Sequence, residues 1–314
     1  MRIYVSGSTG LVGSAVVKSL KEAGHKVYNP SIKIDLLNPK HLEGLESFLE
    51  VGDINLVIHC AGKVGGIKAN SEDNQGFHNQ NYQMGINLIN TAKSAGVPYF
   101  INLASSCAYP TNSELPLNES EFFNDDAEYE PTNEGYAHAK VGVAYHLLRT
   151  YGARGTTLIP CNLYGVGDRY FEGSHIIPDL IQKLHKAKEQ GLKEITLYGT
   201  GQQYREFMNS KDLAYLISKV VNDIPFNEYF RHYLMNIKTH NEISTMELAT
   251  KVAFTIGWSG TIKWSGELSG IKRKPLDITL ANSSYITNIS PIRLIDGLQE
   301  QYQDYLRRFK NGII

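Results

Sequence analysis

The chain has 314 residues, with 31 Lys and Arg against 32 Asp and Glu, and 42% of it is hydrophobic. This length can bury a large core, in one large domain or two smaller ones. The balanced charge predicts no nucleic-acid surface, and no stretch approaches the roughly 20 apolar residues that span a bilayer, so we expect a protein without membrane partners. The three cysteines, Cys60, Cys107 and Cys161, lack metal-ligand spacing. Free thiols in a reducing cytoplasm, with no bound metal, are therefore expected.

The first twenty residues have the order strand, glycine turn, helix. An apolar run over Arg2 to Ser6 is followed by glycines at three-residue intervals and then by apolar residues at helical spacing. Glycines let the backbone approach a pyrophosphate, and a helix N-terminus stabilises its charge. The turn therefore predicts a dinucleotide site formed by Gly7, Thr9, Gly10, Leu11 and Val12.

Strands and helices then alternate. Strands are expected at 27–28, 54–62, 99–105 and 157–160, and helices at about 81–95 and from just after Asn133 to about Arg149. This alternation predicts an α/β fold with a Rossmann-like, doubly wound parallel sheet that binds ligands at the carboxyl ends of its strands. Later helices are expected at 176–188, 212–221, 244–256 and 291–309, and strands at 195–198, 234–237 and 262–264.

The alternation breaks down after Gly165, which predicts two units. Residues 1–165, with about 208–240, should form the dinucleotide-binding domain. Residues 166–207 and 241–314 should form a smaller, discontinuous substrate lobe.

Tyr136 and Lys140 are four residues apart in the helix expected after Asn133, so they share one face. An ammonium beside a phenol favours the phenolate and should lower the pKa of Tyr136 toward neutrality. Ser105 ends a strand upstream and can hydrogen-bond a carbonyl. The three residues predict proton exchange at a carbonyl oxygen.

This ordered set resembles the short-chain dehydrogenase/reductase superfamily, in its extended branch that modifies sugar nucleotides. Longer motifs resemble the GDP-L-fucose synthase family, the GDP-4-keto-6-deoxy-mannose 3,5-epimerases/4-reductases. The segments that carry this resemblance are 60–70 (CAGKVGGIKAN), 105–110 (SSCAYP), 130–134 (EPTNE), 162–165 (NLYG), 174–178 (SHIIP) and 204–207 (YREF).

The resemblance implies roles for individual residues. Cys107 would be the base and His175 the acid for epimerisation at C3 and C5, while Tyr136 and Ser105 hold the C4 oxygen. Lys140 would hold the nicotinamide ribose. Further cofactor contacts are expected from Ser31, Lys33, Asp35, Ala61, Gly62, Leu103, Asn162, Leu163 and His175. Substrate contacts are expected from Ser106, Asn162, Lys183, Tyr198, Arg205 and Lys274.

Departures from the family pattern bear on the cofactor and the substrate. Ser8-Thr9 replaces the family's His-Arg, and no acidic residue follows the second strand where a free ribose 2′-hydroxyl would be bound. Lys33 nearby favours NADPH, and NADH stays open. Tyr198 stands where the family has tryptophan, and Lys183 where it has arginine.

Three alternatives therefore stay open beside a GDP-sugar epimerase/reductase. One is an enzyme that only reduces a GDP-4-keto-heptose or 6-deoxy-heptose for a surface polysaccharide. Another is a non-catalytic dinucleotide sensor. The third is a 4-epimerase or 4,6-dehydratase with a permanently bound cofactor, although its usual Thr-Asp/Glu is replaced by Ser106-Cys107. By analogy with the superfamily, a homodimer built on helices 81–95 and 136–149 is expected.

Overall fold

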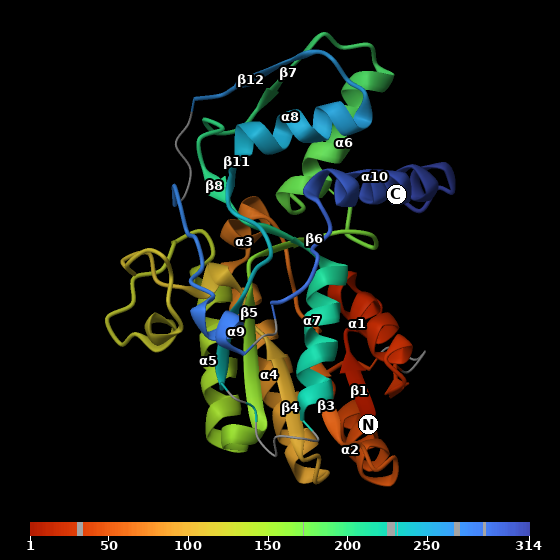
Figure 1. Cartoon of the computed structure of the whole chain (residues 1–314), viewed down its shortest axis with the longest axis vertical. Coiled ribbons are helices and arrows are strands. Elements are labelled where there is room, and N and C mark those ends of the chain that lie inside the picture. Colours follow the sequence, from red (N-terminus) through yellow and green to blue (C-terminus); the bar gives the residue numbers. More distant parts are fainter. Residues whose placement is uncertain (30–33, 172, 225–229, 231, 267–270, 285–286) are drawn as a thin grey trace.

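The computed structural model describes residues 1–29, 34–171, 173–224, 230, 232–266, 271–284 and 287–314. A six-stranded parallel sheet forms the centre of the lower part of the molecule in Figure 1, with the strand order β10-β5-β4-β3-β1-β2. Its strands are β1 (Arg2–Ser6), β2 (Lys26–Tyr28), β3 (Leu56–His59), β4 (Tyr99–Leu103), β5 (Gly155–Pro160) and β10 (Leu234–Ile237). The strand order reverses beside β1, which places a ligand crevice at its carboxyl end.

Successive residues of each strand point to opposite faces of the sheet, and both faces are buried. Ile3 and Val5 belong to one hydrophobic core, whereas Tyr4 between them belongs to another. In β3, Ile58 and Val57 divide in the same way. The apolar runs seen in the sequence thus form strands that are covered on both sides.

Helices form a layer on each face. Helices α1 (Leu11–Glu22) and α7 (Ser210–Asp223) pack together and contribute to the first core (Figure 1). On the opposite face, α2 (Pro39–Val51) packs on α4 (Asn74–Ser94), which packs on α5 (Glu134–Tyr151). The doubly wound parallel architecture predicted from the sequence is confirmed.

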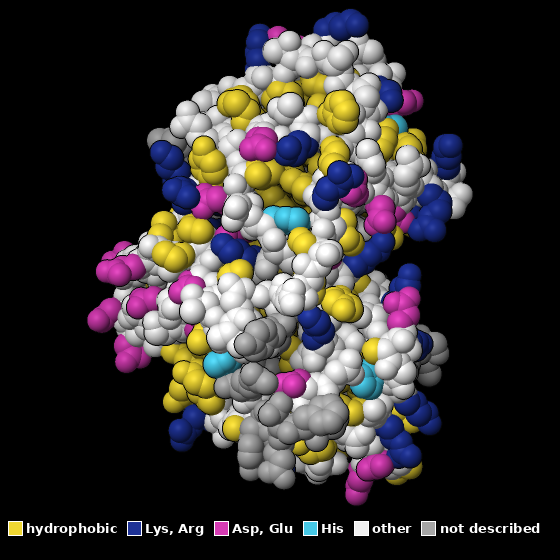
Figure 2. All heavy atoms as spheres, viewed as in Figure 1, with side chains coloured by type: hydrophobic (Ala, Val, Ile, Leu, Met, Phe, Trp, Pro, Cys, Tyr) yellow, Lys and Arg dark blue, Asp and Glu magenta, His cyan; other side chains and the backbone are white. Residues whose placement is uncertain are grey.

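A third hydrophobic core lies in the upper part of Figure 1. Its helices are α6 (Ile176–Glu189), α8 (Thr245–Ile256) and α10 (Leu294–Lys310), beside the parallel pair β7 (Glu194–Leu197) and β12 (Thr261–Trp264). On the face in Figure 2, basic and acidic side chains are interspersed over this part, in keeping with the balanced charge. In the described ranges, none of the helices combines the length and apolarity needed to cross a membrane.

Short elements complete the fold. They are β6 (Asn162–Tyr164) paired with β9 (Phe207–Asn209), β8 (Tyr204–Arg205) paired with β11 (Ile243–Ser244), α3 (Ile67–Glu72), α9 (Thr279–Ser283) and 3₁₀ helices at Ser106–Ala108, Glu119–Phe123 and Gly152–Arg154. Leu276 and Ala281 pack in the first core, against the sheet. The region 276–281 thus packs on the lower part, although the sequence groups it with the substrate lobe.

Most predicted elements are present, and two of the larger differences concern helices. The helix expected from residue 81 begins at Asn74, because the Asp73 carboxylate accepts a hydrogen bond from Gly76 N at 3.1 Å and caps it there. Helix α2 was not predicted. Asn38 caps it, Pro39 begins it, and Leu45 and Leu49 are its buried side chains.

Candidate active site

The glycine turn after β1 is packed too closely for side chains. Gly7 has φ +64°, and a Cβ there would lie 2.6 Å from Ala61 N. A Cβ on Gly13 would lie 2.1 Å from the Gly7 carbonyl oxygen, and Gly10 N donates to that oxygen at 3.0 Å. The turn therefore brings bare backbone to the N-terminus of α1, which suits a phosphate group.

Lys140 lies at the base of the site. Its Nζ donates to the Leu103 carbonyl at 2.8 Å and lies 5.6 Å from the centre of the Tyr136 ring. A Cβ on Gly62 would be 3.9 Å from the same nitrogen, which places the segment after β3 beside it. Burial lowers the pKa of Lys140 to about 8.

Tyr136 does not have the lowered pKa that the sequence predicts. Burial raises its pKa, the nearby Cys107 charge raises it further, and a hydrogen bond with Ser105 only partly opposes them. The prediction is wrong because burial is the largest effect on this phenol, and the Lys140 ammonium is directed to the Leu103 carbonyl. Tyr136 is thus a protonated phenol, suited to donate a proton.

Cys107 lies among cationic groups. Ser105 Oγ caps its 3₁₀ turn by accepting from Cys107 N at 3.2 Å, and Lys274 Nζ lies 3.1 Å from Cys107 Sγ. Burial raises the pKa of the thiol, but the Lys274 charge and hydrogen bond, Ser105 and the Arg205 charge outweigh it, so the pKa is lowered. The site can therefore hold a thiolate.

Arg205 is held by backbone. Its guanidinium donates to the carbonyls of Tyr204 at 2.6 Å, Ile271 at 2.8 Å and Lys272 at 3.4 Å. Burial lowers the pKa of Arg205, while the negative charge of Cys107 favours its charged form. These bonds hold the guanidinium in place and use three of its five N–H donors, so it can offer the others to a phosphate oxygen.

His175 immediately precedes α6, where two loops meet. Gly66 N donates to the Gly173 carbonyl at 2.8 Å, so the glycine-rich segment after β3 packs directly on the loop that ends at His175. The buried carboxyl of Asp168 has a pKa raised by burial, and the His175 charge opposes that rise. The segment resembling KVGGI and the segment resembling SHIIP are thus neighbours.

The remaining predicted residues are more dispersed. Ala61 N donates to Ser6 Oγ at 3.4 Å and Asn162 Nδ2 to the Glu206 carbonyl at 3.0 Å, so both lie at strand ends. Lys183 pairs with Asp179 on its own helix at 2.7 Å. The others differ in exposure: Ser106 is buried, Leu163 is half-buried, Tyr198 is exposed, and Asp35 accepts from Leu37 N at 2.9 Å. Ser31 and Lys33 lie outside the described residues.

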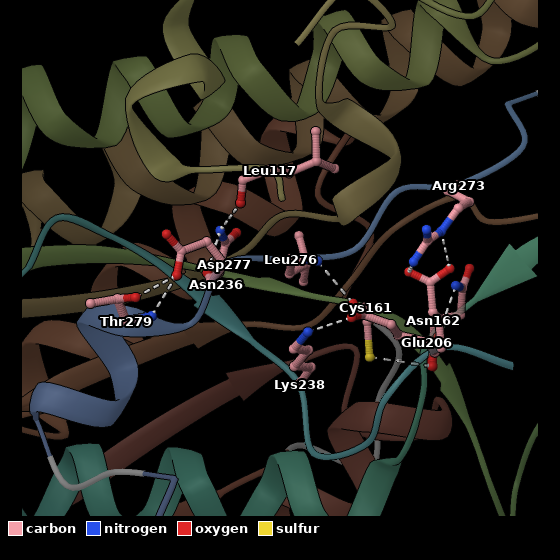
Figure 3. A network of polar contacts seen from close by, with 11 residues as sticks. Leu117, Cys161, Asn162, Glu206, Asn236, Lys238, Arg273, Leu276, Asp277 and Thr279 are labelled. Atoms are coloured by element: carbon pink, nitrogen blue, oxygen red, sulfur yellow. Dashed lines mark hydrogen bonds and ion pairs between the residues drawn. The ribbon is translucent and has the colours of Figure 1, made fainter. Parts of the chain in front are cut away.

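Some residues around the site were not predicted. Asn133 Nδ2 donates to the Cys107 carbonyl at 3.3 Å, and Asn81 holds both the N–H and the carbonyl of Lys63 at 2.9 and 3.0 Å. Glu206 joins Lys238 and the backbone of Leu276 (Figure 3). Asn133 and Glu206 occur within the family-like motifs, which was a usable signal, whereas Asn81 lies in a helix with no motif.

Residues 3–233 match the family described as "NAD dependent epimerase/dehydratase family", and the chain belongs to it. The chain is 34% identical to GDP-L-colitose synthase of Yersinia pseudotuberculosis, over 99% of this chain and 100% of that protein. It is 35% identical to GDP-L-fucose synthase 1 of Arabidopsis thaliana, over 99% and 94%. Within the family it therefore groups with the GDP-L-fucose synthases, which confirms the resemblance in the motifs.

The fold comparison points to similar enzymes. The structure of a GDP-mannoheptose C4 reductase from Campylobacter jejuni with NADP bound is similar with a TM-score of 0.81 and 25% identity. The match covers 97% of this chain and 98% of that one.

Proposed function

We propose that the protein is an NADPH-dependent enzyme that reduces the C4 ketone of a GDP-linked 4-keto sugar and also epimerises C3 and C5. The observation that carries this proposal is the joining of two sets of groups at one strand end. A protonated Tyr136 and Lys140 lie there together with a Cys107 thiol held by a cation. A simple reductase needs the first set, whereas a proton abstraction beside a ketone needs the second.

The residues present fit a dinucleotide. The turn at Gly7 and Gly10 and the first turn of α1 would take the pyrophosphate, with Thr9, Leu11 and Val12 around it. Lys140, Ala61, Gly62, Leu103, Asn162, Leu163 and His175 would line the nicotinamide half, and Ser31, Lys33 and Asp35 the adenosine ribose. NADPH supplies hydride for the reduction, and the similar C4 reductase has NADP bound.

Epimerisation needs an acid and a base on opposite faces of the sugar. The Cys107 thiolate takes the proton from the carbon next to the ketone, and the electron pair of the C–H bond moves onto the C4 oxygen as an enolate. The hydroxyls of Tyr136 and Ser105 hold that oxygen by hydrogen bonds. His175 returns a proton to the opposite face, which inverts the carbon.

Reduction ends the sequence. As C4 accepts hydride, Tyr136 gives its proton to the C4 oxygen, and the phenolate that remains has its ring centre 5.6 Å from the Lys140 ammonium. The raised pKa of Tyr136 fits this direction of transfer, because the proton stays on the phenol until the oxygen becomes basic.

The GDP moiety would bind on the upper side. Arg205 offers its fixed guanidinium to the diphosphate, and Lys274, Ser106, Asn162, Lys183 and Tyr198 complete the proposed substrate contacts. In this scheme residues 1–165 and about 208–240 bind the cofactor, and 166–207 and 241–314 bind the nucleotide sugar, with 276–281 packed on the sheet.

The setting follows from the same chemistry. We place the enzyme in the cytoplasm, where NADPH is available, in the synthesis of a sugar nucleotide for a polysaccharide. A homodimer would form through α4 and α5, which pack side by side and expose Tyr82 and Tyr145.

The test is turnover in deuterium oxide with NADPH and a panel of GDP-4-keto sugars, both 6-deoxyhexoses and heptoses. The proposal predicts NADPH oxidation and one deuterium at each of C3 and C5 of the product, read by mass spectrometry and NMR. Cys107→Ser should lose the deuterium but still reduce a substrate that already has the product configuration. No NADPH oxidation with any member would refute the reductase.

A reductase without epimerisation is the second candidate, favoured by the similarity to a GDP-mannoheptose C4 reductase. It predicts NADPH oxidation with a heptose substrate and no deuterium at C3 or C5 in the same experiment.

A further inference from the structure

Residues 274–277, here called the strap, are held in place from both sides. Leu117 N donates to the Pro275 carbonyl at 2.8 Å, and Asp277 N donates to the Leu117 carbonyl at 2.9 Å. On the other side, Leu276 N donates to Glu206 Oε2 at 3.1 Å, and the Leu276 side chain is buried (Figure 3). The backbone that carries Lys274 is thus ordered by contacts that involve no substrate.

Glu206 is itself anchored. Its carboxylate is buried and pairs with Lys238 Nζ at 2.5 Å, directly after β10, and its carbonyl accepts from Asn162 at 3.0 Å (Figure 3). The strap is therefore tied through Glu206 to the carboxyl ends of β5 and β10. Its geometry is part of the fold.

The strap brings Lys274 to the thiol. Lys274 Nζ lies 3.1 Å from Cys107 Sγ, and both residues are partly buried. The other charged or titratable groups around this sulfur are Arg205 of β8 and Tyr136 of α5, while the Ser105 hydroxyl is a neutral hydrogen-bond partner. Of these, Lys274 is the cation in direct contact.

We propose that Lys274 is a positioning residue that holds the Cys107 sulfur as a thiolate before substrate binds, at a distance set by the strap. This inference rests on the base role given to Cys107 in the proposed function and assigns the group that prepares it. The direction of the shift in the Cys107 pKa agrees, because the combined effects of Lys274, Ser105 and Arg205 outweigh burial.

The experiment measures alkylation of the full chain by iodoacetamide between about pH 5 and pH 10 without substrate, with Cys107 followed by peptide mass spectrometry. Only a thiolate reacts at an appreciable rate. Burial raises the pKa of Cys60 to about 12 and that of Cys161 as well, so these thiols contribute little near neutral pH. Lys274→Met should lower the Cys107 rate at pH 7 by about tenfold and move its pH profile to higher pH.

Two variants separate contact from net charge. Lys274→Arg keeps a cation on the strap and should retain most of the wild-type rate. Lys272→Met removes an equal charge two residues away, where the side chain is exposed and the bonds to Tyr204 and Arg205 are made by the backbone carbonyl, and it should leave the profile unchanged. Lys274→Gln gives a second neutral side chain, and thermal unfolding of all four variants checks that the fold is retained.

Four outcomes are decisive. A Cys107 profile that does not move in Lys274→Met and Lys274→Gln overturns the proposal, as does an equal shift in Lys272→Met. A rise in KM for the nucleotide sugar with an unchanged alkylation profile also overturns it, because Lys274 then serves only the substrate. A shifted profile in an enzyme that never incorporates deuterium at C3 or C5 supports the thiolate contact and refutes the epimerase half of the proposed function.

Discussion

The site has two regions that stabilise different charge states, although each places a lysine near a cysteine. We call them the Lys140 region, which includes Tyr136 and Cys60, and the Lys274 region, which includes Cys107 and Arg205. In the Lys140 region, Lys140 donates to the Leu103 carbonyl, and burial has the largest effect on the pKa values of its neighbours. The pKa of Lys140 falls to about 8, that of His59 to about 3, and that of Cys60 rises to about 12. In the Lys274 region, Lys274 contacts Cys107 directly, and the pKa of this thiol is lowered despite burial.

The difference shows that a lysine near a cysteine does not by itself make a thiolate. Lys140 lowers the pKa of Cys60, but desolvation is the larger effect there. At Cys107 the cation is at hydrogen-bond distance, and Arg205 and Ser105 add to it. Burial around Lys140 therefore favours the neutral forms of Tyr136, Cys60 and His59, whereas the contact with Lys274 supports a Cys107 thiolate that can take a proton.

The largest expected effect comes from removing the general acid of the Lys140 region. Tyr136→Phe deletes the hydroxyl that donates to the C4 oxygen and should lower turnover by about 10²- to 10⁴-fold, as for other general acids. NADPH affinity should change little, because the phenyl ring and Lys140 remain. Stopped-flow NADPH oxidation and fluorescence titration of the cofactor measure the two quantities.

Deuterium exchange in the same variant sharpens the comparison. If proton abstraction in the Lys274 region does not depend on the acid of the Lys140 region, Tyr136→Phe should still exchange deuterium at C3 and C5. The rate should be reduced, because Ser105 alone then holds the enolate oxygen. Unchanged turnover in Tyr136→Phe would contradict the assignment of the acid.

A smaller effect is expected from weakening Glu206, the residue that anchors the strap in the Lys274 region. Glu206→Gln keeps an acceptor for Leu276 N but leaves the Lys238 ammonium, which is 15% exposed, without its carboxylate. Breaking a buried pair costs several kcal/mol, and partial exposure of Lys238 reduces this to about 2 kcal/mol of unfolding free energy. Urea unfolding measures that loss.

An exposed ion pair serves as the control. Lys211 and Glu300 pair at 2.6 Å but are 45% and 47% exposed, so Glu300→Gln should cost under about 1 kcal/mol. Equal losses in the two variants would show that Glu206 is no special anchor of the strap.

The sequence predicted the sheet and the glycine turn, because these depend on periodicity and local spacing. It also predicted that Ser105, Tyr136 and Lys140 lie close together, as they do, while their catalytic roles stay a prediction. It could not predict the contact of Lys274 with Cys107. That contact joins residues 167 positions apart and depends on Glu206, Lys238 and the Leu117 backbone. It also predicted the wrong direction for the Tyr136 pKa, since spacing places Lys140 on the same face but does not reveal burial or the Leu103 carbonyl.

The last expected effect is similar in size to that of Glu206→Gln and tests whether burial governs the ionisation of Lys140. The pKa of Lys140 is about 8 in the folded chain, against about 10.4 in an unfolded chain, so the unfolded state binds more protons between these values. The cost of burying this lysine is therefore fully present below about pH 8 and is relieved as pH rises toward 10. Relative to Lys140→Met, which has no such cost, the wild type should gain about 2 kcal/mol of unfolding free energy between pH 7 and about pH 10. Urea unfolding of both proteins across this range measures the gain, with the exposed Lys186→Met as the control that should run parallel to wild type. A difference in unfolding free energy between wild type and Lys140→Met that stays constant across this pH range would mean that burial does not lower the pKa of Lys140. The contrast between the Lys140 region and the Lys274 region would then fail.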